Sequence, residues 1–367
     1  MSKLEIFEKV GPGHPDKVAD QIADTFCSII LNLDINAKVA CEVMIVDGKI
    51  IFGGELKVEL EQKYIKLAMQ QSVEKVLKLL DINKKYFIYN KMQKQSNEIN
   101  EAVELENEHI GAGDQGICIG YACRETTEHL PKVQVVADYI IKEITKLIKT
   151  KQIVGFGYDM KLLLTLGKFD STTNWSAKQI IFAIQHDKSK TLNEVRTYMR
   201  YIISKLLYEQ DVEITPFTEF IINAGGTFHK GGSDADTGLT GRKIACDNFA
   251  NCSNGGGAFS GKDWTKVDRT GTYLARYIAN NVLYHNPYLN EVIVKLVYAI
   301  GQEYPKIYIN GAQNKTIKLK PLYKIIDIFK NKMCYSLDEI TMNHWIWDLP
   351  WEEIEYNKGK SWILNDN

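Results

Sequence analysis

Gly255-Gly256-Gly257-Ala258-Phe259-Ser260-Gly261-Lys262-Asp263 is the stretch that reveals most about the fold of this chain. Three consecutive glycines let the backbone adopt positive φ angles and approach a ligand closely. Beyond the stretch, apolar residues recur at helical spacing, which predicts a helix opened by this loop. These residues are Leu274, Tyr277, Ile278 and Val282. A glycine loop that leads into a helix N-terminus is a ready anion site, and the natural anion is a polyphosphate.

The loop differs from a Walker A sequence, in which Ser or Thr follows the Gly-Lys pair. Gly256 and Gly261 have the required spacing, but Asp263 follows Lys262 where a magnesium-binding hydroxyl is needed. Taken alone, the loop is equally compatible with a glycine-rich surface turn beside a solvated lysine.

Two other stretches combine glycines with an acid. They are Gly11-Pro12-Gly13-His14-Pro15-Asp16-Lys17 and Gly111-Ala112-Gly113-Asp114-Gln115-Gly116. The first adds a histidine and a lysine. The three stretches together carry the residue types needed for phosphate binding, metal binding and proton donation.

These three motifs resemble, in order and spacing, the hallmarks of the S-adenosylmethionine synthetases (methionine adenosyltransferases). Shorter matches support the resemblance: Ala40-Cys41-Glu42, Gly53-Gly54-Glu55, Lys94-Gln95-Ser96, Gly238-Leu239-Thr240-Gly241-Arg242-Lys243 and Lys266-Val267-Asp268-Arg269. The resemblance runs from about Phe7 to Ile300 and more weakly to Pro350-Trp351-Glu352. Three positions depart from the family pattern, namely Pro12, Thr227 and Trp264.

The resemblance implies an α/β (α+β) fold of three similar α/β domains related by pseudo-threefold symmetry. We expect an N-terminal domain over residues 1–100, a central one over 111–230 and a C-terminal one over 231–367. The family favours a mobile gating loop over 96–109. From the residues alone, this polar, acidic segment is equally compatible with a solvated helix.

Local patterns predict the elements in a loose β-α-β order. We expect strands at 38–45 and 49–52 around the turn Asp47-Gly48, and others at 86–89, 117–121, 161–166, 214–223, 292–300 and 306–309. We expect helices from Pro15 and over 56–80, 133–149 and 192–209.

The reaction implied by the resemblance is attack of the methionine sulfur on C5′ of ATP. The tripolyphosphate that leaves is then hydrolysed to pyrophosphate and phosphate. A neutral thioether carries no proton, so the first step needs no general base. It needs alignment of the reacting atoms and stabilisation of a highly charged leaving group.

The resemblance assigns residues to each part of this chemistry. The catalytic set is His14, Lys161, Arg242, Lys243, Lys262 and Lys266. The ATP-binding set is His14, Asp159, Lys161, Phe228, Asp236, Arg242, Lys243, Ala258 and Lys262. The methionine-binding set is Glu55, Gln95, Asp114, Asp236 and Lys266. His14 is suited to stabilising charge on the leaving oxygen, as imidazolium or as neutral donor. The alternative is a cap for the helix that begins at Pro15.

Two Mg²⁺ ions per site and one K⁺ ion are the expected cofactors. The resemblance places Mg²⁺ at Asp16 and Asp268 and K⁺ at Glu42. Asp16, Asp20 and Asp24 lie at i, i+4 and i+8 on one helix face. Such a pattern is usually a solvated acidic stripe, so only Asp16 is assigned to metal.

Bulk properties fit a cytoplasmic enzyme. The 367 residues allow two or three domains, and the net charge of -1 gives no basic footprint for nucleic acid. We expect no membrane partner, because we find neither a long apolar run nor a signal peptide. The seven cysteines suggest reduced, buried thiols.

The expected substrates are ATP and L-methionine. The family implies a homodimer with shared active sites, or a homotetramer built from two such dimers. Two other functions stay open at this stage. One is a phosphotransferase or ATPase that cleaves within the triphosphate, and the other is a non-catalytic nucleotide-binding regulator.

Overall fold

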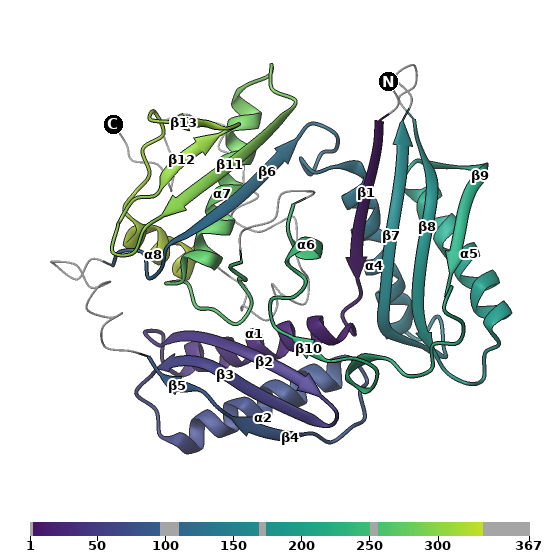
Figure 1. Ribbon diagram of the computed structural model, residues 1–367, viewed down its shortest axis with the longest axis horizontal. Coiled ribbons are helices and arrows are strands. Elements are labelled where there is room, and N and C mark those ends of the chain that lie inside the picture. Colours follow the sequence, from purple (N-terminus) through teal and green to yellow (C-terminus); the bar gives the residue numbers. More distant parts are fainter. Residues whose placement is uncertain (1–2, 96–109, 169–173, 250–255, 333–367) are drawn as a thin grey trace.

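The computed structural model describes residues 3–95, 110–168, 174–249 and 256–332. Three sheets surround the centre of the molecule, each with helices beside it (Figure 1). The prediction of three α/β domains is therefore confirmed. The predicted gating loop, 96–109, lies outside the described residues.

Each sheet has a simple strand order. The first is β1 (Lys3–Val10), β7 (Phe156–Lys168), β8 (Trp175–His186) and β9 (Val212–Ile222). The second is β10 (Gly238–Leu239), β2 (Lys38–Val46), β3 (Lys49–Lys57) and β4 (Phe87–Asn90), with β5 (Gln93–Lys94) also paired to β3. The third is β13 (Ala312–Asn314), β12 (Lys306–Ile309), β11 (Glu291–Tyr298) and β6 (Gly116–Cys123).

The sheets exchange strands between distant parts of the sequence. β1, the first strand of the chain, forms the edge of the β7-β8-β9 sheet, visible as a purple arrow beside teal ones in Figure 1. β6 pairs with β11, and β10 pairs with β2. The predicted segments 1–100, 111–230 and 231–367 are thus stretches of sequence that the sheets link to one another. Their boundaries stay a prediction.

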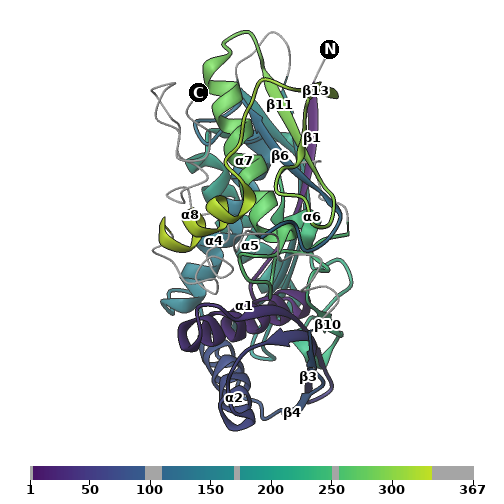
Figure 2. The same cartoon turned by 90° about the vertical axis from the view of Figure 1, so that its left-hand side faces the viewer.

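Helices cover one face of each sheet. They are α1 (Pro15–Leu33), α2 (Gln62–Leu79), α4 (Lys132–Lys149), α5 (Leu192–Glu209), α6 (Ile244–Asp247), α7 (Val267–His285) and α8 (Leu322–Lys332), with the 3-10 turn η2 (Gly232–Asp234). α1 packs on β2, α4 on β7, α5 on β9 and α7 on β6. In Figure 2 the long helices and the strands separate to opposite sides.

The faces of the sheets away from these helices carry apolar side chains. Leu4 is 60% exposed and Ile6 is 57% exposed, whereas Phe7 on the opposite face of β1 is buried. On β6, Ile117 is 48% exposed and Cys118 is buried. Apolar residues in such positions are typical of surfaces that contact another protein.

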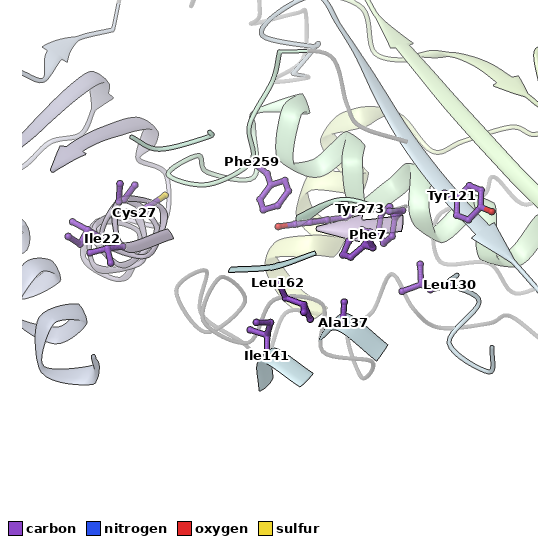
Figure 3. Packing of buried hydrophobic residues seen from close by; sticks show 14 of the residues in the cluster. Phe7, Ile22, Cys27, Tyr121, Leu130, Ala137, Ile141, Leu162, Phe259 and Tyr273 are labelled. Atoms are coloured by element: carbon purple, nitrogen blue, oxygen red, sulfur yellow. The ribbon is translucent and has the colours of Figure 1, made fainter. Parts of the chain in front are cut away.

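The helix faces pack against one another around the centre. α1 buries Ile22 and Cys27 within the cluster of core residues that Figure 3 samples. Phe259 and Tyr273 reach this cluster from the glycine loop and from α7, and α4 adds Ala137 and Ile141. The core therefore joins all three domains through their helices.

Most predicted elements are confirmed, including the tight turn at Asp47 and Gly48, both with positive φ. The helix predicted over 56–80 is wrong at its start, because β3 continues to Lys57 and α2 begins only at Gln62. Strand β8 has no counterpart among the predicted elements. The alternation of buried Ile180, Phe182 and Ile184 along it is the signal that predicts it.

Among the described residues, no helix is long and apolar enough to span a membrane. The five described cysteines are free and buried, as expected for reduced thiols: Cys27, Cys41, Cys118, Cys123 and Cys246.

Candidate active site

A glycine turn brings His14 to the N-terminus of α1. The backbone N–H groups of Gly11 and Gly13 donate to the carbonyls of Met160 and Tyr158, at 2.7 and 3.0 Å. A Cβ on Gly13 would lie 2.5 Å from the carbonyl carbon of Tyr158, so only glycine allows this approach. The turn therefore fixes His14 against β7.

His14 caps α1 and is also suited to catalysis. Its Nδ1 accepts a hydrogen bond from the Asp16 backbone N–H at 3.2 Å. Burial first, and the nearby Lys243 next, lower the pKa of His14 to about 4. The ring is therefore neutral near pH 7. Because Nδ1 accepts, Nε2 carries the proton and can donate.

Asp16 is held by two kinds of donor. Its Oδ2 accepts from the Lys243 ammonium at 2.6 Å, and its Oδ1 accepts from the Leu239 N–H at 2.9 Å. The Arg242 guanidinium lies 3.8 Å from Oδ1. Burial raises the pKa of this carboxyl, but Lys243 and the Leu239 N–H outweigh it, so the net pKa is lowered. Asp16 is thus an ionised carboxylate that orients two cations.

Two further candidate residues, Asp159 and Lys161, lie on β7 near His14. Asp159 on β7 is buried and accepts from the Gly232 N–H at 2.7 Å. Burial, with a smaller contribution from Asp236, raises the pKa of Asp159 to about 6. Lys161, two residues further, lies 3.0 Å from Glu8 on β1. His14, Asp16, Lys243, Arg242, Asp159, Lys161 and Asp236 together form what we call the His14 group.

The acidic stripe on α1 is not solvated, and here the sequence interpretation was wrong. Asp16, Asp20 and Asp24 are 2%, 1% and 0% exposed. The backbone N–H groups of Gly241 and Gly261 donate to Asp20 at 2.8 Å and to Asp24 at 2.5 Å. The stripe therefore binds the backbone of two downstream glycine motifs to α1.

The glycine loop and the start of α7 carry a second set of site residues. We call Ala258, Lys262, Lys266 and Asp268 the Lys262 group. Lys262 forms an ion pair with Asp268, in the first turn of α7. A Cβ on Gly257 would collide with the Asp268 carboxylate, which explains the glycine there. Lys266 is the N-cap residue of α7, and Ala258 is half-buried in the loop.

Strand β2 connects this loop to the residues that are predicted to bind the substrate methionine. Ala40 on β2 pairs with Glu55 on β3 and forms a bridge with Lys262 on its other side. Glu55 and Lys262 thus occupy one row across the sheet, about 10 Å apart given the strand spacing. Gln95 lies just past β5 and is 5% exposed. Its Oε1 accepts no hydrogen bond within the described part of the chain.

The remaining candidates lie at the edges. Asp114 is exposed and precedes β6 by two residues, and a Cβ at Gly116 would lie 3.8 Å from Asp268. Phe228 is half-buried, and its backbone exchanges hydrogen bonds with His186. Across residues 3–95, 110–168, 174–249 and 256–332, no hydrogen bond or ion pair joins the His14 group to the Lys262 group.

Three domain models of one protein family match this chain in order. Family models match at residues 3–103 (S-adenosylmethionine synthetase, N-terminal domain), 109–228 (central domain) and 230–351 (C-terminal domain). The chain belongs to the S-adenosylmethionine synthetase family.

Relatives in this family match over nearly full length. The S-adenosylmethionine synthase of Mycoplasmopsis pulmonis is 35% identical over 367 residues, 95% of either chain. That of Mycoplasma mycoides is 34% identical over 376 residues, covering 96% of this chain and 95% of the relative. An S-adenosylmethionine synthetase structure from Campylobacter jejuni matches with a TM-score of 0.80 and 27% identity, covering 96% of this chain and 97% of that one.

The carboxylates suit a Mg²⁺ ion that is completed by substrate. Within the described residues, no cluster of three His, Cys, Asp or Glu side chains forms a metal cage. Asp16 and Asp268 each present a carboxylate already beside a lysine. Mg²⁺ is usually bound by one or two carboxylates together with substrate phosphates, and these two residues fit that pattern.

Glu42, the residue predicted to bind K⁺, is exposed on β2. It lies between the places where segments 238–240 and 261–263 pair with the same edge of β2.

Sequence reasoning assigned no role to Arg269, although this residue belongs to the Lys266-Val267-Asp268-Arg269 motif. Arg269 is 0% exposed and donates to Asp24 at 2.5 Å and to the Phe259 carbonyl at 2.8 Å. It thereby ties the glycine loop to α1.

Trp264, a departure from the family pattern, is buried and stacks on Phe329 of α8, with 5.7 Å between the ring centroids. It therefore serves packing.

Proposed function

We propose that the protein is a methionine adenosyltransferase, which forms S-adenosylmethionine from ATP and L-methionine. The observation that carries the proposal is the position of His14, whose Nδ1 accepts from the Asp16 N–H, beside the Asp16–Lys243–Arg242 cluster. Burial and Lys243 lower the pKa of His14, which favours a neutral ring with Nε2–H as the donor. A neutral donor next to fixed cations suits a reaction whose charge develops on a leaving oxygen. The names of the relatives support the same activity.

His14 donates its Nε2–H to O5′ of ATP as the C5′–O5′ bond breaks. The methionine sulfur forms the new bond to C5′, and the triphosphate leaves with the electron pair. A preorganised donor of this kind contributes about 10²–10³ to kcat. Since the sulfur carries no proton, His14 is not required as a base.

The cations hold the triphosphate. Lys161, Arg242, Lys243, Lys262 and Lys266 provide five positive charges. Arg242 binds phosphate through two parallel N–H donors, whereas the lysines act as point charges. Mg²⁺ bound at Asp16 and Asp268 would neutralise further phosphate charge, and K⁺ would bind at Glu42. The same cations then hold tripolyphosphate for hydrolysis to pyrophosphate and phosphate.

Methionine and adenosine occupy the neighbouring residues. Glu55 binds the methionine ammonium. The buried Oε1 of Gln95 accepts a hydrogen bond from the same ammonium. Asp114, Asp236 and Lys266 complete the polar contacts. Phe228 packs on adenine, and the buried Asp159 and half-buried Ala258 line the nucleotide site.

The site is completed between two copies of the chain. The His14 group and the Lys262 group belong to one chemistry, and no hydrogen bond or ion pair joins their side chains within the described residues. The apolar residues Leu4, Ile6 and Ile117 on the outer sheet faces support a second copy there. We therefore propose a homodimer with shared active sites.

Product analysis tests the activity. Incubation with ATP, Mg²⁺ and L-methionine should yield S-adenosylmethionine, pyrophosphate and phosphate in equal amounts. ADP as the product would establish a phosphotransferase instead. Nucleotide binding without turnover would establish a regulator.

Complementation tests the shared site. His14→Asn and Lys262→Met should each be inactive alone. Coexpression gives mixed dimers in which one of the two sites is free of substitutions. About one quarter of wild-type activity should return, from random pairing of two subunit types. If each site lay within one chain, activity would not return.

A further inference from the structure

A cavity of about 530 Å³ lies behind the turn that carries His14. Its walls come from β1, α1, the end of α2, α4 and β7. The described lining residues include none of the candidate site residues. Its volume is typical of sites for small organic ligands.

Several elements give the cavity apolar lining. Val10, Leu80, Val135, Tyr139 and Tyr158 line it. The charged groups deep in the cavity are already paired: Lys9 lies 2.7 Å from Asp138, and Lys17 lies 2.6 Å from Asp247. The interior therefore suits an apolar or aromatic body rather than a bare ion.

The rim adds unpaired positive charge. Lys142, Lys146 and Lys149 lie on one side of α4 and are exposed. Lys146 pairs with Glu143 at 3.1 Å. Over the part of the chain that the structure describes, Lys142 and Lys149 form no ion pair. Glu128 is a half-buried acid in the same lining, and Lys142 and Lys149 together leave the rim with a net positive charge that attracts an anionic group.

One buried acceptor in the lining also lacks a partner. Gln21 is 1% exposed, and its amide Nε2 donates to the carbonyls of Pro12 and Lys17, at 2.8 Å each. Its Oε1 accepts no hydrogen bond among the described residues. An unsatisfied buried acceptor is costly, and a ligand N–H or O–H would remove that cost.

We propose that this cavity is a regulatory site for a small organic anion with an apolar body and one N–H or O–H donor. Two backbone links connect it to the candidate active site. Pro12, in the lining, precedes His14 by two residues and accepts from Gln21. Tyr158, also in the lining, precedes Asp159 and accepts from the Gly13 N–H at 3.0 Å. A ligand that moves either residue alters how His14 is held.

The probe is 8-anilinonaphthalene-1-sulfonate, which combines aromatic rings, a sulfonate and an N–H donor. Fluorescence titration of the folded protein should show saturable binding. Lys142→Glu combined with Lys149→Glu should weaken binding at least tenfold, because the anionic group then meets like charge. Val135→Trp should abolish it by filling the cavity. Lys66→Glu combined with Lys188→Glu, at exposed positions outside the cavity, is the matched control.

Kinetics provide the second readout. The probe should change the rate of S-adenosylmethionine formation at saturating ATP and methionine, and Val135→Trp should remove that effect. Binding that survives both cavity variants would overturn the site, whether or not the protein is a methionine adenosyltransferase. Binding that is lost in these variants but never affects turnover would overturn the regulatory role. Inhibition that persists in Val135→Trp would place the probe in the active site and also overturn it.

Discussion

The two ends of the acidic stripe on α1 show how one residue type serves two purposes. Asp16 and Asp24 lie on the same helix face, both are almost fully buried, and both accept a backbone N–H and a cationic side chain. The cation of Asp24 is Arg269, which is 0% exposed. The cations of Asp16 are Lys243 and Arg242, whose side chains are 16% and 50% exposed.

That difference separates structure from chemistry. At the Asp24 end both charges are fixed inside the protein, so the pair can only hold the glycine loop on α1. At the Asp16 end the cations reach solvent and can exchange the carboxylate for a phosphate. The open end of the stripe is thus available for ligands, and the closed end supports it.

The largest expected effect comes from the closed end. Asp24→Asn leaves Arg269 buried without its carboxylate, and we expect a loss of about 3–5 kcal/mol in the free energy of unfolding. Urea denaturation measures this loss. The matched variant Asp16→Asn should lose less stability but should abolish adenosyl transfer. Equal stability losses in the two variants would break the comparison.

A second variant sharpens the role of the open end. His14→Asn should lower kcat for adenosyl transfer by about 10²–10³, while hydrolysis of added tripolyphosphate changes much less. Asn is itself a good N-cap, so α1 should keep its stability. His14→Ala removes both functions and should cost about 1 kcal/mol more in unfolding free energy. If the two half-reactions fell together in His14→Asn, the catalytic role would be lost.

The pH dependence of stability gives an intermediate effect. The pKa of Asp159 is raised to about 6 from an ordinary 3.8, chiefly by burial. Its stabilising contribution is therefore present below pH 3.8 and lost as the pH rises through 6. As the pH rises from 4 to 8, the free energy of unfolding of Asp159→Asn should increase by up to about 3 kcal/mol relative to that of the wild type.

His14 supplies the control for that measurement. Its lowered pKa of about 4, against an ordinary 6.5, gives a contribution that is present above pH 6.5 and lost as the pH falls toward 4. His14→Asn should therefore gain relative stability at acidic pH, in the opposite direction to Asp159→Asn. Unfolding midpoints across pH 4–8 that shift in parallel for both variants would contradict these environments.

The smallest effect concerns Glu42, which is exposed on β2. Glu42→Gln should change the unfolding free energy by less than about 0.5 kcal/mol. It should nevertheless reduce the stimulation of adenosyl transfer by K⁺ over Na⁺. Glu59→Gln, at another exposed glutamate, should leave the response to K⁺ intact. An undiminished K⁺ response in Glu42→Gln would remove this residue from the ion site.

Much of the fold and of the candidate site could be predicted from the sequence where the signal is local. The helix from Pro15, the Asp47-Gly48 turn and the glycine loop before α7 each follow from neighbouring residues. The prediction of a helix over 56–80 was wrong at its start, because Leu56 fits a helical period and also fits the end of strand β3. Pairing with β2 and β5 decided between them.

The sequence by itself determined the family, the three glycine motifs and the residue types that the chemistry needs. Only the tertiary structure decided which acids are buried, which cations they orient and which tautomer His14 adopts. Asp24 and Arg269 are 245 positions apart, and no local period reveals such a pair. The same holds for β1 beside β7, because burial and long-range pairing depend on where distant segments meet.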